Sequence, residues 1–174
     1  MSQYLPVGLA LGSNLGDRIG NLREARQALA ELPGVEGDSL CYAPVYENEP
    51  VDCKPGAPFF LNTVVEVYSS LAPEALLQSC QDIEVSLGRP ETHGYHADRT
   101  IDIDILYMGD LTVSSERLTL PHPLLTNRLF VVRPLANLRP DLVLPPGSGP
   151  TMAARVDRFG SDALDQMPLF AEVW

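Results

Sequence analysis

Hydrophobic positions along the chain change between a period of two and a period of about 3.6, which predicts strands separated by helices. Apolar or alternating runs predict strands over 7–11, 40–47, 59–68, 99–106, 111–113 and 142–144. Helical spacing of apolar residues predicts helices over 17–32, 72–87, 130–138 and 151–159, with a short helical turn over 124–128. Pro33-Gly34 and Gly88 stop the first two helices.

The order of these elements indicates the class of fold. Strand, helix, strand, strand, helix, strand is typical of an α+β domain with a ferredoxin-like core, an α/β sandwich whose sheet is mostly antiparallel. A chain of 174 residues is long enough for one domain with a full core. We therefore predict a single domain over 1–174, with a core over about 5–146 and a peripheral C-terminal tail over 147–174.

The strand over 99–106 alternates isoleucine with aspartate, which places Asp102 and Asp104 on one face. At about 3.3 Å of rise per residue, their Cα atoms lie about 7 Å apart. Aspartate is depleted in strands, and two carboxylates on one face repel each other unless a cation lies between them. The pair could bind one hard divalent cation, or two cations bridged by a phosphate. The alternative is the solvated face of a surface strand.

Arginine is concentrated around this aspartate pair in a chain that is otherwise acidic. The net charge of −11 argues against nucleic acids and anionic membranes as main partners. The planar guanidinium group suits phosphate, so a phosphorylated substrate remains possible, although surface ion pairs would explain some of the arginines. Five of the eleven lie in one stretch: Arg89, Arg99, Arg117, Arg128 and Arg133.

The cysteines and the apolar runs bear on location. Cys41, Cys53 and Cys80 are scattered and have no C-x-x-C spacing, which suits reduced thiols in the cytoplasm better than a disulfide framework or a zinc site. No apolar run is long enough to span a membrane, and the first residues lack the basic stretch of a signal peptide. We therefore expect a cytoplasmic protein without a membrane partner.

Two other stretches carry polar residues next to apolar runs. The loop over 12–17 could cradle phosphate with its amides, but it lacks the P-loop lysine, and its spacing favours a structural turn with Asp17 or Asn14 capping the next helix. Asn62 interrupts an apolar strand. It either satisfies backbone groups locally or recognises a ligand through hydrogen bonds.

Five motifs follow one another along the chain: G-S-N-L-G at 12–16, F-L-N at 60–62, R-T-I-D-I-D-I-L at 99–106, L-T-L-P-H-P at 118–123 and N-R-x-F at 127–130. At this spacing they closely resemble one enzyme family, the 6-hydroxymethyl-7,8-dihydropterin pyrophosphokinases of folate biosynthesis, from about residue 5 to about residue 146. The resemblance implies transfer of pyrophosphate from ATP to the hydroxymethyl group of the pterin, with release of AMP.

The resemblance also implies which residues form the site. Two Mg²⁺ ions along the ATP triphosphate would be held by Asp102 and Asp104, which together with Arg89 and Arg99 form the expected catalytic set. The implied nucleotide side comprises Gln81, Glu84, Arg117, Thr119, His122 and Arg128. The implied pterin side comprises Asn48, Glu49, Pro50, Val51, Phe60, Asn62 and Phe130. Asn62 would bond the pterin edge, and Phe130 with Phe60 or an aromatic near Tyr46 would stack on the ring.

Taken without the family, three of these residues have simpler interpretations. Glu84 would be a solvated helix position, Phe130 a core aromatic, and His122 a polar residue in a turn bounded by prolines. Asn14 is expected to brace the loop rather than to take part in the chemistry.

The sequence departs from the family in the two segments that precede its motifs. Glu91 and Thr92 stand where Arg or Lys is often found, His96 stands where Trp is often found, and Asn48 and Asp52 replace a common Thr and Gly. These changes motivate an alternative, a catalytically weakened pterin- and nucleotide-binding module on the same fold. A phosphotransferase acting on another small alcohol is a further alternative. For the leading hypothesis we expect a Mg²⁺-dependent monomeric enzyme with ATP and the pterin as small-molecule substrates.

Overall fold

The computed structural model describes residues 3–50, 56–88, 98–144 and 149–174. Its main sheet has the strand order β5-β1-β4-β3-β8, with β2 paired to β4, and every neighbouring pair is antiparallel. The short strands β6 (Val113–Ser114) and β7 (Thr119–Leu120) pair separately. The strands of the main sheet are β1 (Leu5–Ser13), β2 (Cys41–Tyr42), β3 (Val45–Asn48), β4 (Phe60–Ser69), β5 (Asp102–Met108) and β8 (Leu169–Ala171).

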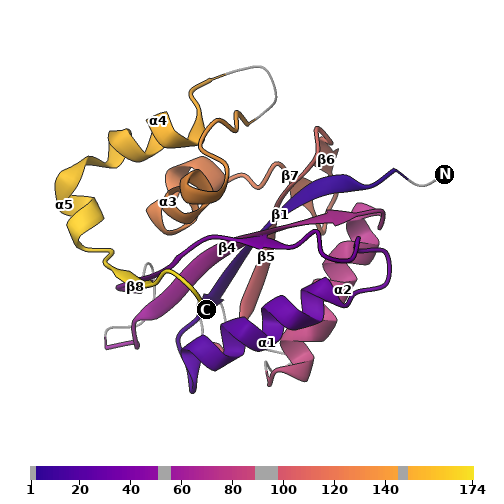
Figure 1. The fold of residues 1–174 in the computed structure, drawn as a ribbon, viewed down its shortest axis with the longest axis horizontal. Coiled ribbons are helices and arrows are strands. Elements are labelled where there is room, and N and C mark those ends of the chain that lie inside the picture. Colours follow the sequence, from indigo (N-terminus) through magenta and orange to yellow (C-terminus); the bar gives the residue numbers. More distant parts are fainter. Residues whose placement is uncertain (1–2, 51–55, 89–97, 145–148) are drawn as a thin grey trace.

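Helices cover both faces of this sheet (Figure 1). One face carries α1 (Arg18–Ala30) and α2 (Pro73–Ser86), and the other carries α3 (Leu129–Leu138) with α4 (Met152–Val156) and α5 (Gly160–Asp165) beside it. Single turns of 3₁₀ helix, η1 (Leu125–Asn127) and η2 (Asp157–Phe159), join these elements. The predicted α+β class with a mostly antiparallel sheet is confirmed. Among the described residues, no helix is both long and apolar enough to cross a membrane.

Apolar stripes attach α1 and α2 to the sheet as the spacing predicts. Leu22, Ala25 and Leu29 of α1 are fully buried against the strands, as are Leu76 and Cys80 of α2. Asp17 caps α1, because its Oδ1 accepts a hydrogen bond from the Gly20 N–H at 3.0 Å. Such a cap contributes about 1 kcal/mol. The loop over 12–17 therefore contains the helix cap expected there.

Two predicted elements differ from the structure for identifiable reasons. The strand predicted over 40–47 is divided into β2 and β3, because the Ala43 carbonyl accepts hydrogen bonds from the Thr63 hydroxyl (3.0 Å) and the Trp174 indole (2.8 Å). Pro44 follows and has no N–H to donate to a ladder. No strand forms over 142–144, since the Leu142 carbonyl accepts from the Met152 N–H at 2.9 Å in a turn that leads into α4.

Three other elements keep their type but change in extent. The helix predicted over 130–138 begins at Leu129 and contains Pro134 in its interior rather than in its first turn. The helix predicted over 151–159 consists of α4 and η2 instead. The short strand predicted over 111–113 lies at Val113–Ser114.

Within the tail over 147–174 that was expected to be peripheral, Leu169–Ala171 form a strand of the sheet and Trp174 is buried. β8 pairs with β3, and Trp174 is only 4% exposed. The Arg26 guanidinium lies over the rings of both Tyr42 (4.6 Å) and Trp174 (4.5 Å) and donates to the Trp174 carbonyl. Cation–π contacts of this kind add about 0.5–1 kcal/mol each at exposed sites.

A glycine in β1 allows its two neighbouring strands to bond across it. Gly8 lies opposite Glu66 of β4 and opposite Tyr107 of β5. The Tyr107 hydroxyl donates to the Glu66 carboxylate, and Arg139 Nη1 donates to both of its oxygens at 2.7 Å. Burial, followed by the negative charge of Glu66, raises the pKa of Tyr107 above its ordinary value of 10.0, so the hydroxyl stays a donor. This network fastens the end of α3 to the sheet.

We predict that Gly8→Ala lowers the free energy of unfolding by about 1–3 kcal/mol, the usual cost of overpacking. A Cβ at position 8 would lie 2.2 Å from Tyr107 Cε1. Chemical denaturation monitored by circular dichroism measures the change. Gly37→Ala is the matched control, because a Cβ at exposed Gly37 meets nothing within 4 Å. Equal stability of the two variants would contradict the packing argument.

Candidate functional site

Three strands bring the predicted metal and pterin residues to one face of the sheet. Gly12 of β1 lies opposite Asn62 of β4 and opposite Asp102 of β5. Residues directly opposite each other share a face, so Asp102 and Asn62 flank Gly12 with Cα atoms about 10 Å apart, two strand spacings. Asp104 shares this face one step further along, opposite Ala10.

Gly12 adds no side chain to the sheet surface between Asp102 and Asn62. A Cβ at this position would lie 2.8 Å from Asn62 Oδ1, closer than such contacts occur. Any side chain at position 12 would therefore displace the Asn62 amide. The glycine leaves an interval between a carboxylate and an amide, on the face of the sheet that α3 covers.

The carboxylate end of this row is balanced by an arginine. Arg99 Nη1 lies 2.8 Å from Asp102 Oδ2, and the two side chains are 18% and 26% exposed. Within the described ranges, no three His, Cys, Asp or Glu side chains gather as a metal cluster. Two carboxylates nevertheless suit Mg²⁺, which usually keeps several waters and binds one or two carboxylates together with substrate phosphates. Asp102 and Asp104 fit that pattern.

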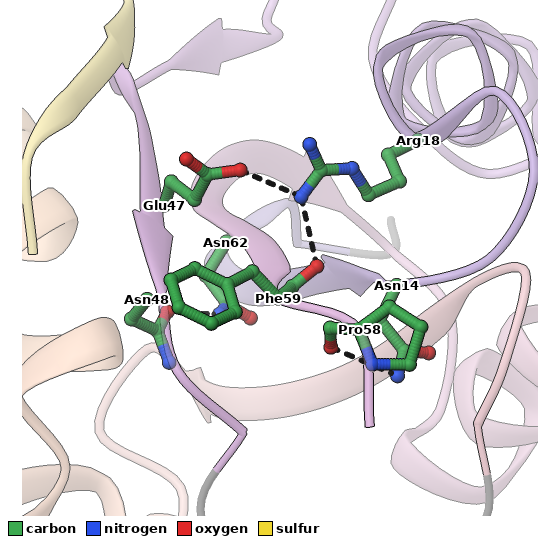
Figure 2. A network of polar contacts seen from close by, with 7 residues as sticks. All are labelled: Asn14, Arg18, Glu47, Asn48, Pro58, Phe59 and Asn62. Atoms are coloured by element: carbon green, nitrogen blue, oxygen red, sulfur yellow. Dashed lines mark hydrogen bonds and ion pairs between the residues drawn. The ribbon is translucent and has the colours of Figure 1, made fainter. Parts of the chain in front are cut away.

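The amide end of the row is a pair of asparagines. Asn62 Nδ2 donates to Asn48 Oδ1 at 2.6 Å, and Asn48 Nδ2 donates to the Glu49 carbonyl at 2.8 Å. Both side chains are buried, at 8% and 9% exposure, and Figure 2 shows them side by side on neighbouring strands. Phe60, which is half-buried, precedes Asn62 on β4 and is paired with Asn48 of β3. Within the described part of the chain, the Asn62 amide donates to another side chain rather than to a nearby backbone group.

Helix α2 supplies polar groups along the edge strand β5. Glu84 is 7% exposed and accepts a hydrogen bond from the Ile103 N–H at 2.6 Å, between the two aspartates. The interpretation of Glu84 as a solvated helix position is therefore wrong. Burial, with the charges of Glu84 and Asp104, raises the pKa of the neighbouring Cys80 to about 12. This thiol is therefore protonated at neutral pH.

An arginine from the β6–β7 turn reaches the same helix. Arg117 Nη2 donates to Gln81 Oε1 at 3.1 Å and to Gln78 Oε1 at 3.3 Å. Gln78 is not among the residues that the sequence motifs single out. It precedes Gln81 by three positions, and that spacing places both side chains on one helix face. Thr119 lies exposed on β7, two residues after Arg117.

His122 lies near both the carboxylate end of the row and an arginine. Desolvation by burial, and then the charge of Arg128, lower its pKa from 6.5, whereas Asp102 acts in the opposite direction. The imidazole is therefore neutral at pH 7. Its Nδ1 accepts from the Leu124 N–H at 3.1 Å, so the neutral ring carries its proton on Nε2 and can donate it. His122 thus accepts a hydrogen bond within its turn through Nδ1, and its Nε2–H can donate as well.

With this geometry described, the chain can be compared with known proteins. Residues 8–140 match the family model of 7,8-dihydro-6-hydroxymethylpterin-pyrophosphokinase (HPPK). The chain belongs to the HPPK family.

Relatives in this family differ in how much of their own length this chain matches. A Methylorubrum extorquens 2-amino-4-hydroxy-6-hydroxymethyldihydropteridine pyrophosphokinase is 36% identical over 160 residues, which are 90% of this chain and 97% of the relative. The Schizosaccharomyces pombe folic acid synthesis protein fol1 is 38% identical over 92% of this chain, but the chain spans only 20% of that relative. Wild-type HPPK-DHPS of Plasmodium falciparum, solved with SDX-DHP, has the same fold at a TM-score of 0.72 and 15% identity, over 95% of this chain and 46% of that chain.

The predicted HPPK site residues fall into groups within the structure. Asp102, Asp104 and Arg99 lie together, Glu84 bonds the same strand, and Gln81 bonds Arg117. Arg128 lies over the Phe130 ring at 5.6 Å, and that ring is half-buried against the α3 layer. Glu49 and Pro50 directly follow β3. Arg89 and Val51 lie outside the described residues, as do His96 and the altered segment around it.

Tyr46 is excluded as the stacking aromatic by its own contacts. It is 6% exposed, its hydroxyl donates to Asn137 Oδ1 at 2.7 Å, and Arg133 covers its ring at 4.5 Å. Phe60 remains as the partner for Phe130 in any ring sandwich.

Asn14 braces the loop, as expected. Its Nδ2 donates to Asp98 Oδ1 at 2.7 Å and to the Pro58 carbonyl at 3.4 Å, and its Oδ1 accepts from the Arg99 N–H at 2.8 Å. These bonds hold the ends of the two long segments that precede β4 and β5.

We predict that the imidazole of His122 titrates with a midpoint below 6.5, and that Arg128→Gln raises this midpoint while Asp102→Asn lowers it further. Removing a nearby positive charge favours the protonated ring, and removing a negative charge disfavours it. Nitrogen-15 NMR of the imidazole across pH 4.5–8 measures the three midpoints.

The same shift affects stability. The unfolded chain binds this proton at a higher pH than the folded chain, so acidification from 6.5 to the folded pKa lowers the free energy of unfolding, and above 6.5 the contribution is complete. His122→Gln should reduce this loss. An unchanged midpoint in Arg128→Gln would contradict the assigned geometry.

Proposed function

We propose that this chain transfers the pyrophosphate group of ATP to the hydroxymethyl group of 6-hydroxymethyl-7,8-dihydropterin, giving AMP and the pterin diphosphate for folate synthesis. Membership of the HPPK family supports the reaction. The observation that carries the proposal in this chain is the row Asp102–Gly12–Asn62 across three strands. A carboxylate suited to a phosphate-bound cation and an amide suited to a heterocycle edge lie there on one face, separated by a glycine.

On the nucleotide side, the residues of this chain neutralise and orient phosphate. Asp102 and Asp104 would hold two Mg²⁺ ions, which supply Lewis-acid charge neutralisation along the triphosphate when bound. Arg99 then exchanges part of its pairing with Asp102 for phosphate oxygens, since a guanidinium binds both groups. Neutral His122 donates from Nε2. Phosphoryl-type transfer depends mainly on such positioning and charge stabilisation, so no covalent intermediate is expected.

On the pterin side, hydrogen bonds set the orientation of the ring. The Asn62 amide recognises the edge of the pterin, with Asn48 beside it, and Phe60 and Phe130 provide flat surfaces for stacking. We assign Glu49 and Pro50, which directly follow β3, to the same side. The described residues keep the aspartates and Asn62 in place, so they lend no support to a catalytically weakened binding module.

The net charge and the cysteines support the rest of this proposal. With a net charge of −11, the chain acts on small molecules rather than on nucleic acids or membranes. It works as a monomer in the cytoplasm, a location supported by the scattered cysteines.

The test is an AMP-release assay with ATP, Mg²⁺ and the hydroxymethyl pterin. We predict that Asp102→Asn and Asp104→Asn each lower turnover about 100-fold or more, because the charge stabilisation supplied by a metal ion is worth several kcal/mol. Chelation of Mg²⁺ should have the same effect. Asp110→Asn is the matched control, since Asp110 lies exposed in the turn after β5.

Two results would contradict the proposed function. The first is AMP release that does not depend on the pterin, and the second is transfer to a different small alcohol that the pterin fails to inhibit. Near wild-type turnover in either aspartate variant would contradict the metal assignment alone.

A further inference from the structure

The first residue of α1 joins three separate parts of the chain. Arg18 Nη1 donates to Glu47 Oε1 of β3 and to the carbonyl of Phe59, just before β4, both at 2.8 Å. The ring of Phe170 in β8 lies 5.9 Å from the same guanidinium. Figure 2 shows the side chain extending from the helix to both strand ends.

An arginine in this position does not serve the helix. A positive charge in the first turn of a helix is opposed by the helix dipole, at a cost of about 0.3–1 kcal/mol. An exposed ion pair alone would contribute about 0–1 kcal/mol, and these side chains are 27% and 29% exposed. The distinctive feature is that one Nη1 amino group binds both the carboxylate of Glu47 in β3 and the backbone carbonyl of Phe59 just before β4.

The carbonyl of the preceding residue, Pro58, is bound by a side chain of the turn that leads from β1 into α1. Asn14 Nδ2 donates to the Pro58 carbonyl at 3.4 Å, while Arg18 holds Phe59. Two consecutive carbonyls at the entry to β4 are therefore bound by side chains from the turn after β1. These carbonyls precede the first paired residue of β4 and have no partner in the β3–β4 ladder.

The bonds of Arg18 act where the β3–β4 ladder ends. The last paired residues are Asn48 and Phe60, and Glu47 lies opposite Leu61. Successive side chains on a strand point to opposite faces, so Glu47 points toward α1, while Asn48 points to the face that carries Asn62. Strand ends open most easily, and here the end that could open carries the Asn48–Asn62 hydrogen bond of 2.6 Å.

We propose that Arg18 is a positioning residue for the pterin: by tying Glu47 and the Phe59 carbonyl together on one face of the sheet, it holds Asn48 and Asn62 in register on the other. The proposal rests on the proposed function, because it assigns the Asn pair to the pterin. Arg18 acts through the strands and does not touch the substrate. Its loss should weaken pterin binding and leave the nucleotide side unchanged.

The experiment compares Arg18→Met with Arg23→Met, which removes the same charge from an exposed position of the same helix. Pterin affinity is measured by fluorescence titration in the presence of Mg²⁺ and a non-hydrolysable ATP analogue. We expect Arg18→Met to raise the Kd and the KM for the pterin about 5–30-fold, which corresponds to one or two kcal/mol. The KM for ATP should change by less than about twofold, as for independent sites.

A structural readout separates positioning from a general loss of stability. The side-chain amide resonances of Asn62, assigned by an Asn62→Asp variant, should shift in Arg18→Met and stay in place in Arg23→Met. Arg18→Lys should restore part of the affinity, since an ammonium group can also bind a carboxylate and a carbonyl. If Arg18→Met does not fold, Glu47→Gln removes the ion pair and should give the same selective rise in the KM for the pterin.

Each remaining outcome decides against the proposal in a distinct way. Wild-type pterin affinity in folded Arg18→Met and Glu47→Gln would overturn it, as would equal losses for ATP and pterin or an equal loss in Arg23→Met. An absence of pterin-dependent AMP release by the wild-type chain would overturn the proposed function as well. Normal wild-type turnover with unaffected variants would overturn only the role of Arg18.

Discussion

The structure depends on two glycines, Gly8 and Gly12, on one face of strand β1. At Gly8 the neighbouring strands bond directly across β1, through Tyr107 and Glu66. At Gly12, which lies between Asp102 and Asn62, the missing side chain leaves room for the Asn62 amide, because a Cβ there would lie 2.8 Å from Asn62 Oδ1. Gly8 leaves room for the network through which Arg139 attaches α3 to the sheet. Gly12 lies at the base of the candidate site. The two glycines of β1 thus serve both the stability of the fold and the candidate site.

Positive charge in this acidic chain is placed where the proposed reaction would require it to meet a triphosphate. Arg99 already pairs with Asp102, and Arg128 lies near enough to His122 to lower its pKa. Arg117 is held by glutamine side chains rather than by a carboxylate, so its charge is not cancelled by its partners. Local positive charge at the nucleotide side therefore coexists with a net charge of −11, and phosphate binding needs no basic surface elsewhere.

The opposite face of the sheet supports the site by packing, and α2 on that face adds Glu84, which bonds the aspartate-bearing strand. Buried leucines of α1 and α2 fix the strands from that side, while Arg18 and Asn14 hold the ends of the segments that lead into β4 and β5. The edge strand β8 adds a further contact through Phe170. The positions of Asn48 and Asn62 thus follow from packing on both faces, which is why a residue of the helix layer can influence a ligand on the other layer.

Short-range patterns in the sequence were enough to predict the class of fold, the cap at Asp17 and the aspartate-bearing strand, because these depend on periodicity and on bonds between residues close in the chain. The motifs at their spacing also indicated the HPPK family, and the match of residues 8–140 to the family model confirms it. Other features required the tertiary structure, because they join residues far apart in the chain. They include the burial of Glu84 against the Ile103 amide, the burial of Tyr46 beneath the α3 layer, and the pairing of Leu169–Ala171 with β3. The interval at Gly12 is of the same kind: the sequence shows a glycine after a strand, and only the register of three strands places it between a carboxylate and an amide.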